Sequence, residues 1–157
     1  MTERVYLETS IISYLAARPS RDLVTAARQQ LTHEWWSRRR SGFELYVSEL
    51  VVTEAALGDP DAAERRARWI QDLPSLAITD EATALARKLA KAAGLPERAT
   101  LDALHIALAA CHGMEYLLTW NSSHIANAEF RPKVERACRD NGYEPPVLCT
   151  PDELMGV

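Results

Sequence analysis

Short apolar runs typical of buried strands alternate along this chain with longer segments in which apolar residues recur every three or four positions. The strand-like runs lie at residues 4–7, 44–47, 76–78, 116–119 and 147–149. The segments between them have the periodicity of helices that pack one face against a sheet. This alternation predicts an α/β fold, with a central parallel sheet of about five strands flanked by helices in an α/β/α sandwich.

Residues that favour helix ends mark several boundaries. Capping side chains precede three of the predicted helices: Ser48, Asp59, and Thr79 or Asp80. Earlier in the chain, Ser20 is expected to cap a helix that has Asp22 in its first turn. Residues 95–97 are expected to be a linker, and the strand at 147–149 is expected at an edge of the sheet.

The most apolar helix and the strand after it form the centre of the predicted site. Residues 100–112 are apolar over most of the helix circumference, which indicates a buried helix. Asp102 and His105 are three residues apart, so they share one narrow side of it. A strand at 116–119 and a polar loop at 120–124 follow. Ligands of parallel sheets gather at the carboxyl ends of strands, so this arrangement is typical of an α/β active site.

Length, composition and charge are those of an ordinary globular domain. The 157 residues suit a single domain, 1–157, that needs neither metal nor disulfide to stabilise its core. The formal net charge of −4 and the pI near 5.6 argue against a broadly cationic nucleic-acid binder. They remain compatible with a nuclease, because an acidic metal site adds negative charge and local arginine patches can hold RNA.

The cysteines and the N-terminal sequence indicate in which cellular compartment the protein is expected. Cys111, Cys138 and Cys149 form no CxxC pair, and an odd, widely spaced set favours reduced thiols. The first ten residues lack the apolar segment of a signal peptide. The longest apolar run is interrupted by Asp102 and His105 and is shorter than the roughly 20 residues of a membrane span. We therefore expect a cytoplasmic protein with no membrane segment.

Three acidic residues from separate segments are candidates for catalysis. Glu8 follows the first strand, where its side chain would enter the crevice. Glu54 is predicted on the same side of its helix as Leu50 and Leu57, and a carboxylate among leucines must be paired, metal-bound or protonated. Asp102 stands in the first turn of the buried helix, where the helix dipole favours an ionised carboxylate. Each acid also has a plain structural interpretation: an exposed strand end, an ion pair with a buried arginine, or a helix start.

If the three carboxylates meet at one end of the sheet, they repel one another, and a bound divalent cation removes that cost. Oxygen ligands suit Mg²⁺ or Mn²⁺ better than Zn²⁺. A carboxylate-held cation in an open crevice neutralises phosphate charge and activates water for attack. The acids therefore predict metal-dependent phosphodiester hydrolysis at Glu8, Glu54 and Asp102.

Other kinds of site have weaker support. The six glycines form no GxGxxG or P-loop motif, and no GxSxG motif occurs. Four residues could suggest zinc: His105, Cys111, His112 and His124. Their spacing matches no usual zinc site, so histidines that pack or form hydrogen bonds are favoured. Trp35, Trp36 and the run Arg38–Arg40 could grip RNA, but a solvated helix end is the preferred interpretation.

Four short motifs resemble those of PIN-domain ribonucleases. They occur in the family's order: Leu7-Glu8-Thr9-Ser10-Ile11-Ile12, Ser48-x-x-Val51-x-x-Glu54, Asp102-Ala103-x-x-Ile106-Ala107 and Leu118-Thr119-Trp120-Asn121-x-x-His124. The third motif is the most specific, and the four in order are far more specific than any one alone. Two positions depart from the family: Glu8 replaces the usual Asp, and Asn121 stands where many members have a fourth acid.

The resemblance implies a PIN fold and a Mg²⁺- or Mn²⁺-dependent endoribonuclease, most often the VapC-type toxin of a type II toxin–antitoxin pair. It implies Glu8, Glu54 and Asp102 as metal ligands and adds Asn121 to the catalytic residues. The partners it implies are RNA, a small antitoxin protein and a second copy of the chain in a homodimer. The surface expected for a partner is the apolar part of the first helix: Ile11, Ile12, Tyr14 and Leu15.

Two other functions remain open from the sequence. A non-catalytic PIN-like nucleic-acid-binding or regulatory module would have the same motifs without turnover. A phospho-receiver domain would share the sheet and the acidic pocket. It would need a lysine after the last strand, where Pro151-Asp152-Glu153 stands instead.

Overall fold

Five parallel strands form the central sheet of the computed structural model, which describes residues 2–156. They are β1 (Glu3–Leu7), β2 (Phe43–Ser48), β3 (Ser75–Leu76), β4 (Tyr116–Leu118) and β5 (Val147–Cys149), in the order β3-β2-β1-β4-β5. The predicted parallel sheet and the edge position of β5 are confirmed. The chain adds β2 and β3 on one side of β1 and later β4 and β5 on the other. The crevice between the carboxyl ends of β1 and β4 is therefore the switch point where open α/β sheets bind ligands.

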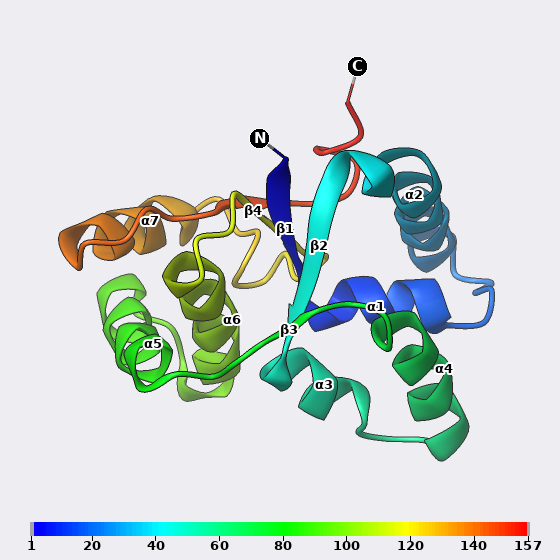
Figure 1. The fold of residues 1–157 in the computed structure, drawn as a ribbon, viewed down its shortest axis with the longest axis horizontal. Coiled ribbons are helices and arrows are strands. Elements are labelled where there is room, and N and C mark those ends of the chain that lie inside the picture. Colours follow the sequence, from blue (N-terminus) through cyan, green and yellow to red (C-terminus); the bar gives the residue numbers. More distant parts are fainter. Residues whose placement is uncertain (1, 157) are drawn as a thin grey trace.

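Helices cover both faces of the sheet, which confirms the α/β/α layers. They are α1 (Thr9–Ala16), α2 (Leu23–Arg39), α3 (Glu49–Ala55), α4 (Pro60–Ile70), α5 (Asp80–Ala93), α6 (Thr100–Cys111) and α7 (Arg131–Asp140). In Figure 1, α5, α6 and α7 lie on one side of the strands and α1, α2 and α4 on the other. Short 3₁₀ turns occupy Arg40–Gly42 and Glu97–Ala99, and the second begins inside the predicted linker.

Local side-chain bonds explain where the helices begin. Ser48, Asp59 and Thr79 each accept a hydrogen bond from the backbone N–H three residues later, as predicted for helix caps. The predicted start of α2 is wrong. Asp22 is the N-cap and accepts the N–H three residues on (2.9 Å), whereas the Ser20 hydroxyl accepts the Asp22 N–H outside the helix.

The third strand is shorter than predicted and ends earlier. The N–H of Ile78 donates to Oε1 of Glu49 (2.9 Å) rather than to a neighbouring strand, and Ile78 is 40% exposed. The chain therefore leaves the sheet after Leu76 and turns towards α5.

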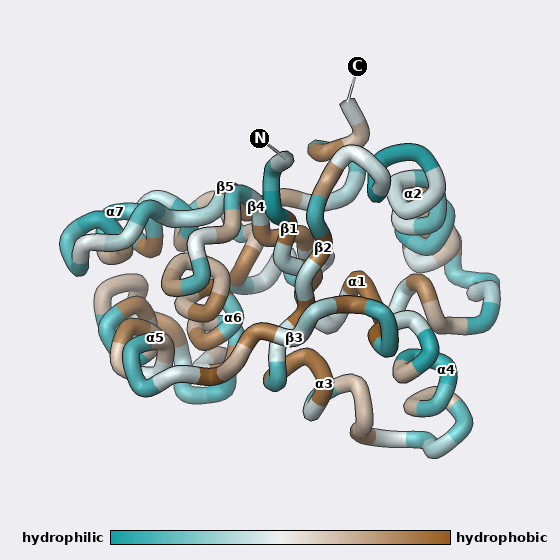
Figure 2. Tube along the Cα trace, in the orientation of Figure 1, coloured by the Kyte–Doolittle hydropathy of each residue, from teal (hydrophilic) through white to brown (hydrophobic). Residues whose placement is uncertain are grey.

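The core lies between the sheet and the inner faces of the helices, where apolar segments gather (Figure 2). Val5, Tyr6 and Leu7 of β1 are fully buried. Ile11 and Ile12 of α1 are also 0% exposed. The expectation that this apolar part of the first helix faces a partner is therefore wrong for Ile11, Ile12 and Leu15, which the fold itself covers, whereas Tyr14 is half-buried.

The buried helix α6 is enclosed by the domain. Its residues from Ala103 to Ala110 are buried apart from the half-buried Leu104, and α5 packs along it. Within residues 2–156, no helix combines the length and the apolar character that crossing a membrane requires.

Candidate metal centre

The acidic site begins at the carboxyl ends of β1 and β4. Glu8 is the first residue after β1, and its backbone N–H donates to the carbonyl of Leu118 at the end of β4 (3.0 Å). This bond sets Glu8 beside Thr119, at the switch point of the sheet. The first predicted acid therefore lies where the topology places the crevice.

The Glu8 carboxylate is buried and is held through one oxygen. Its Oε1 accepts hydrogen bonds from the hydroxyls of Ser10 (2.5 Å) and Thr119 (2.6 Å). The Ser10 hydroxyl in turn accepts the N–H of Trp120 (2.8 Å). A buried carboxylate needs such donors because it has lost its water. The first and fourth motifs meet at this oxygen.

Glu54 comes from α3 and lies against α1 and α6. Its Oε1 accepts from the hydroxyl of Thr9 (2.5 Å) and lies 2.7 Å from Nε2 of His105. Burial acts to raise the pKa of Glu54, but the hydrogen bonds from His105 and Thr9 lower this pKa below its ordinary value. The leucine-lined environment predicted for Glu54 is wrong in part, since Leu57 is 64% exposed.

Asp102 is held from the loop that follows β4. Its Oδ2 lies 2.8 Å from Nδ1 of His124, and both side chains are partly exposed. The ring of His124 also packs against Phe130, with 5.9 Å between the ring centres. The third motif is thereby joined to the fourth.

All three carboxylates share one bonding pattern. Glu8 and Glu54 use Oε1, and Asp102 uses Oδ2, to bind protein donors. The second oxygen of each has no hydrogen-bond or ion-pair partner among residues 2–156. These oxygens are not sealed from water, since the only enclosed, unpartnered side-chain N or O atoms in that range are Nε of Arg39 and of Arg131. Each carboxylate is therefore fixed at one oxygen and free at the other.

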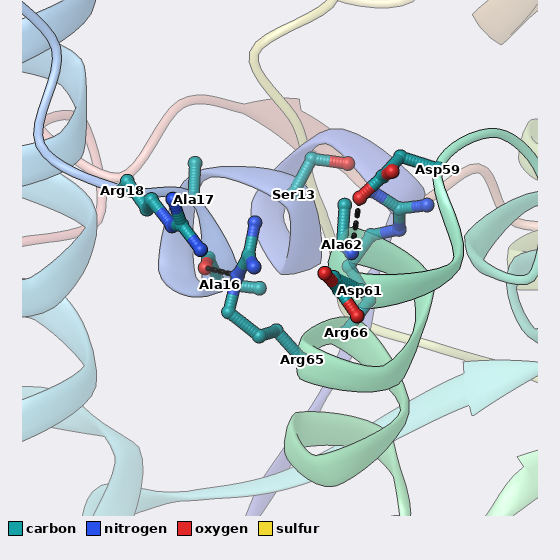
Figure 3. A pocket seen from close by; sticks show the side chains of 9 residues that line it. All are labelled: Ser13, Ala16, Ala17, Arg18, Asp59, Asp61, Ala62, Arg65 and Arg66. Atoms are coloured by element: carbon teal, nitrogen blue, oxygen red, sulfur yellow. Dashed lines mark hydrogen bonds between the residues drawn. The ribbon is translucent and has the colours of Figure 1, made fainter.

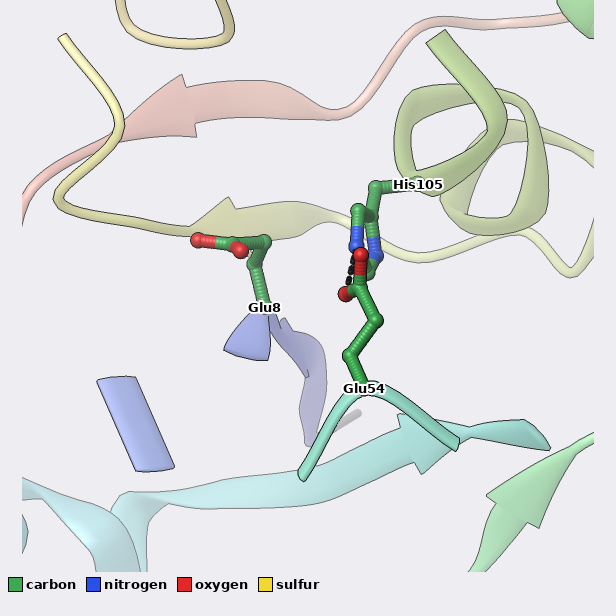
Figure 4. A group of neighbouring side chains, drawn as sticks. All are labelled: Glu8, Glu54 and His105. Atoms are coloured by element: carbon green, nitrogen blue, oxygen red, sulfur yellow. Dashed lines mark hydrogen bonds and ion pairs between the residues drawn. The ribbon is translucent and has the colours of Figure 1, made fainter. Parts of the chain in front are cut away.

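The size of the group suits a cation. Glu8, Glu54 and His105 offer ligand atoms within 4.8 Å of one another (Figure 4). Two oxygens on opposite sides of Mg²⁺ are about 4.2 Å apart, so the carboxylates need little movement to share an ion. His105 fits less well, because Tyr6 and Glu54 occupy its two nitrogens. Asp102 is not part of this group of three residues, but it lies about one helical turn before His105 on α6.

Comparison with known families decides the identity of the fold. The family model described as PIN domain matches residues 5–130. The chain belongs to the PIN domain family. PIN domains are generally metal-dependent nucleases, and the acidic group lies within the matched residues. Curated proteins give no match to this chain.

A solved structure supports the PIN fold over most of the chain. The structure described as "Structure of FitAB bound to IR36 DNA fragment" superposes with a TM-score of 0.57 at 17% identity and covers 94% of this chain and 94% of that one. At this identity the likeness concerns the fold alone. It extends beyond the residues that the family model matches.

In this PIN domain, Asn121 shapes its own loop. Its Oδ1 accepts hydrogen bonds from the backbone N–H groups of Ser123 and His124 (both 3.2 Å), and the backbone N–H of Asn121 donates to the hydroxyl of Thr119 (2.9 Å). Such side-chain bonds to nearby backbone define a tight turn. Both lone pairs of Oδ1 are used within the loop, and the turn brings His124 to Asp102.

Sequence reasoning did not place His105 in the site of this PIN domain. The sequence did contain one indication that His105 belongs to the site, which was its position on the same narrow side of α6 as Asp102. Only the fold shows that its ring, 1% exposed, reaches Glu54. The zinc alternative finds no support in the part of the chain that the structure describes, because His112 bonds to the carbonyl of Ala77 instead of joining the other histidines.

A separate hollow of about 490 Å³ lies between α1 and α4 (Figure 3). Its charged lining residues are Arg18, Asp59, Asp61, Arg65 and Arg66. Arg65 donates through Nε to a carbonyl at the end of α1 (3.2 Å), and Arg66 donates to carbonyls at the end of α3 and just beyond it. Arginines and aspartates thus share the lining, so this hollow is not a uniformly basic groove. Trp35 is fully buried, so the alternative in which it grips RNA does not hold, and the preferred solvated position does not hold for Trp35 either.

Proposed function

We propose that this PIN domain is a divalent-metal-dependent endoribonuclease in which Glu8, Glu54 and Asp102 hold Mg²⁺ or Mn²⁺. The observation that supports this most strongly is their shared bonding pattern, with one fixed and one free oxygen on each carboxylate. Free carboxylate oxygens at a switch point are ligands for a hard cation. Protein donors behind such ligands commonly orient them, as the hydroxyl and imidazole groups do in this site.

The chain's own residues would prepare the site. A divalent cation bound there would neutralise phosphodiester charge and lower the pKa of an attacking water. Hydroxyl donors hold Glu8 and Glu54 in position, and His124 holds Asp102. Asn121, which the resemblance adds to the catalytic residues, would act by fixing the turn that places His124.

We further propose a VapC-type role, with RNA as the substrate, a small antitoxin as the inhibitory partner and a cytoplasmic homodimer as the assembly. The similar FitAB structure is described as bound to a DNA fragment, which supports a nucleic acid as a binding partner for this chain. Since the isoleucines of α1 are buried within the fold, the surface for an antitoxin helix would be the apolar groove between α3 and α4. Its lining is Val52, Ala55, Ala56, Ala63, Glu64, Ala67 and Ile70. Ala55, the residue after Glu54 in α3, is part of this lining, and an amphipathic helix is the kind of partner that an apolar groove binds.

The test is incubation of the purified protein with a mixed RNA pool and a matched single-stranded DNA pool, with Mg²⁺, with Mn²⁺ and with EDTA. We expect RNA cleavage only when metal is present. Binding of RNA and Mn²⁺ without cleavage would favour the non-catalytic module instead.

A further inference from the structure

We infer that His105 is a positioning residue: its Nε2–H holds the Glu54 carboxylate, and Tyr6 and Ser48 fix the imidazole in that tautomer. The part of this inference that concerns a cation rests on the proposed function. Tyr6 and Ser48 are fully buried and His105 is 1% exposed, so water cannot replace the bonds between them.

A continuous line of hydrogen bonds runs from the backbone of α3 to Glu54. The N–H of Val51 donates to Oγ of Ser48 (3.2 Å), which lies 2.8 Å from Oη of Tyr6. That Oη lies 2.6 Å from Nδ1 of His105, and Nε2 of the same ring lies 2.7 Å from Glu54. The line joins β1, the end of β2, α3 and α6.

Only one arrangement of hydrogens gives every donor in this line an acceptor. Ser48 donates its hydrogen to Tyr6, and Tyr6 donates its own to Nδ1 of His105, which is therefore unprotonated. Burial raises the pKa of Tyr6, so the phenol keeps the hydrogen that it donates. The imidazole hydrogen is left on Nε2 and is donated to Glu54.

Any arrangement with a hydrogen on Nδ1 of His105 fails at Ser48, and the neutral ring of this kind also fails at Glu54. If Nδ1 of His105 donated to Tyr6, then Tyr6 would donate to Ser48, and the hydrogen of Ser48 would have no acceptor among the described residues. A buried donor without a partner is unfavourable. If Nε2 were also unprotonated, its lone pair would face the Glu54 carboxylate oxygen at 2.7 Å, and the two would repel.

His105 therefore presents no free lone pair to a cation, although one of its nitrogens lies within 4.8 Å of a carboxylate oxygen of Glu8 and of Glu54. Its effect on a cation is indirect, through the orientation of Glu54. Ser48 has two roles in this arrangement. It caps α3, the helix that contains Glu54, and it also begins the line of bonds that fixes the imidazole.

The decisive measurement is a long-range ¹H–¹⁵N NMR spectrum of the labelled protein at neutral pH, first without metal and then with saturating Mg²⁺, which is diamagnetic. Loss of signals in His105→Gln assigns the ring. We expect a protonated Nε2 and an unprotonated Nδ1 under both conditions. A ring protonated on Nδ1, alone or together with Nε2, or an Nε2 that loses its hydrogen when Mg²⁺ binds, overturns the inference.

Mn²⁺ calorimetry on variants provides the second readout. His105→Ala and Tyr6→Phe should weaken Mn²⁺ binding by about 10- to 100-fold. His105→Gln can still donate an amide N–H to Glu54 and should recover part of that loss. His112→Gln, at the C-cap of the same helix, is the matched control and should bind Mn²⁺ like the wild type.

The outcomes separate this inference from the proposed function. Equal Mn²⁺ affinity in His105→Ala, Tyr6→Phe and the wild type overturns the positioning role, provided that circular dichroism shows each variant folded. If no variant and no wild-type protein binds Mn²⁺, the proposed function fails, while the metal-free NMR spectrum still decides the tautomer.

Discussion

Nδ1 of His124 lies 2.8 Å from Oδ2 of Asp102, although 22 residues separate them in the sequence. The bond joins the first turn of α6 to the loop after β4. It fixes one oxygen of Asp102 and leaves the other free. His124 thereby supports Asp102 in the way that the hydroxyls of Ser10 and Thr119 support Glu8.

Asp102→Asn should abolish metal-dependent RNA cleavage and leave the fold intact. Asparagine has the same shape and can still bond to His124, but it has no charge to hold a cation. Cleavage assays with circular dichroism test this, and Asp61→Asn, an exposed first-turn acid of α4, is the control that should cleave normally. Full activity in folded Asp102→Asn would remove Asp102 from the site.

Glu54→Gln should lower the free energy of unfolding by about 1 kcal/mol in EDTA at neutral pH, because His105 and Thr9 bond to an ionised carboxylate. The repulsion between acids that the sequence predicts would alone give the opposite sign, a more stable Glu54→Gln in EDTA. Urea unfolding measures the difference. Glu64→Gln, which loses only an exposed ion pair with Arg68, should change stability by less than about 0.5 kcal/mol.

The Glu54 effect should also depend on pH. The folded-state pKa of Glu54 is below its ordinary value of 4.5, so its contribution is fully present above pH 4.5 and is lost as the pH falls through the lowered pKa. The stability difference between the wild type and Glu54→Gln should therefore shrink in acid. A constant difference down to the acid transition would mean that the charge of Glu54 does not contribute.

Asn121→Ala should destabilise the protein by about 1–2 kcal/mol, because Ser123 and His124 lose the acceptor of their N–H groups. Asn121→Asp keeps an acceptor there and should unfold like the wild type. Calorimetric titration should show nearly unchanged Mn²⁺ affinity in Asn121→Asp. A clear gain in Mn²⁺ affinity or stoichiometry would place residue 121 next to the cation instead of behind it.

The three thiols should react slowly in the folded protein at neutral pH. Burial raises the pKa of Cys138 and of Cys149 to about 12, and burial also raises that of the half-buried Cys111. Titration with a chromogenic disulfide should detect Cys111 first and all three only in concentrated guanidinium chloride. Rapid reaction of all three thiols without denaturant would contradict their burial in the folded protein.

The sequence was sufficient to predict the sheet, the helix order and the caps at Ser48 and Asp59, because these depend on periodicity and on bonds between near neighbours. It was insufficient at the end of β3, where the side chain of Glu49 takes the N–H of Ile78. Periodicity also showed that Ile11 and Ile12 belong to an apolar surface of a helix. It could not show whether the sheet or a partner covers that surface.

The candidate site, like the fold, was predictable only in part from the sequence. The acids Glu8 and Glu54 follow elements that end at one edge of a parallel sheet, so their meeting could be expected. The bonds that hold them could not be, because they come from residues far away in the sequence. His105 illustrates this, since its role depends on Tyr6 in β1, 99 positions earlier. The role of Asn121 depends on a turn whose side-chain bonds no spacing reveals.

The most direct test of the account follows Mn²⁺ binding and RNA cleavage in one preparation, for the wild type and for Glu8→Gln. The account predicts that cleavage rises over the same Mn²⁺ range in which calorimetry detects binding. It also predicts that EDTA stops cleavage, and that folded Glu8→Gln neither binds Mn²⁺ tightly nor cleaves RNA. Undiminished cleavage in EDTA or in Glu8→Gln, or tight Mn²⁺ binding with no cleavage of any RNA, would contradict a metal-dependent ribonuclease centred on these carboxylates.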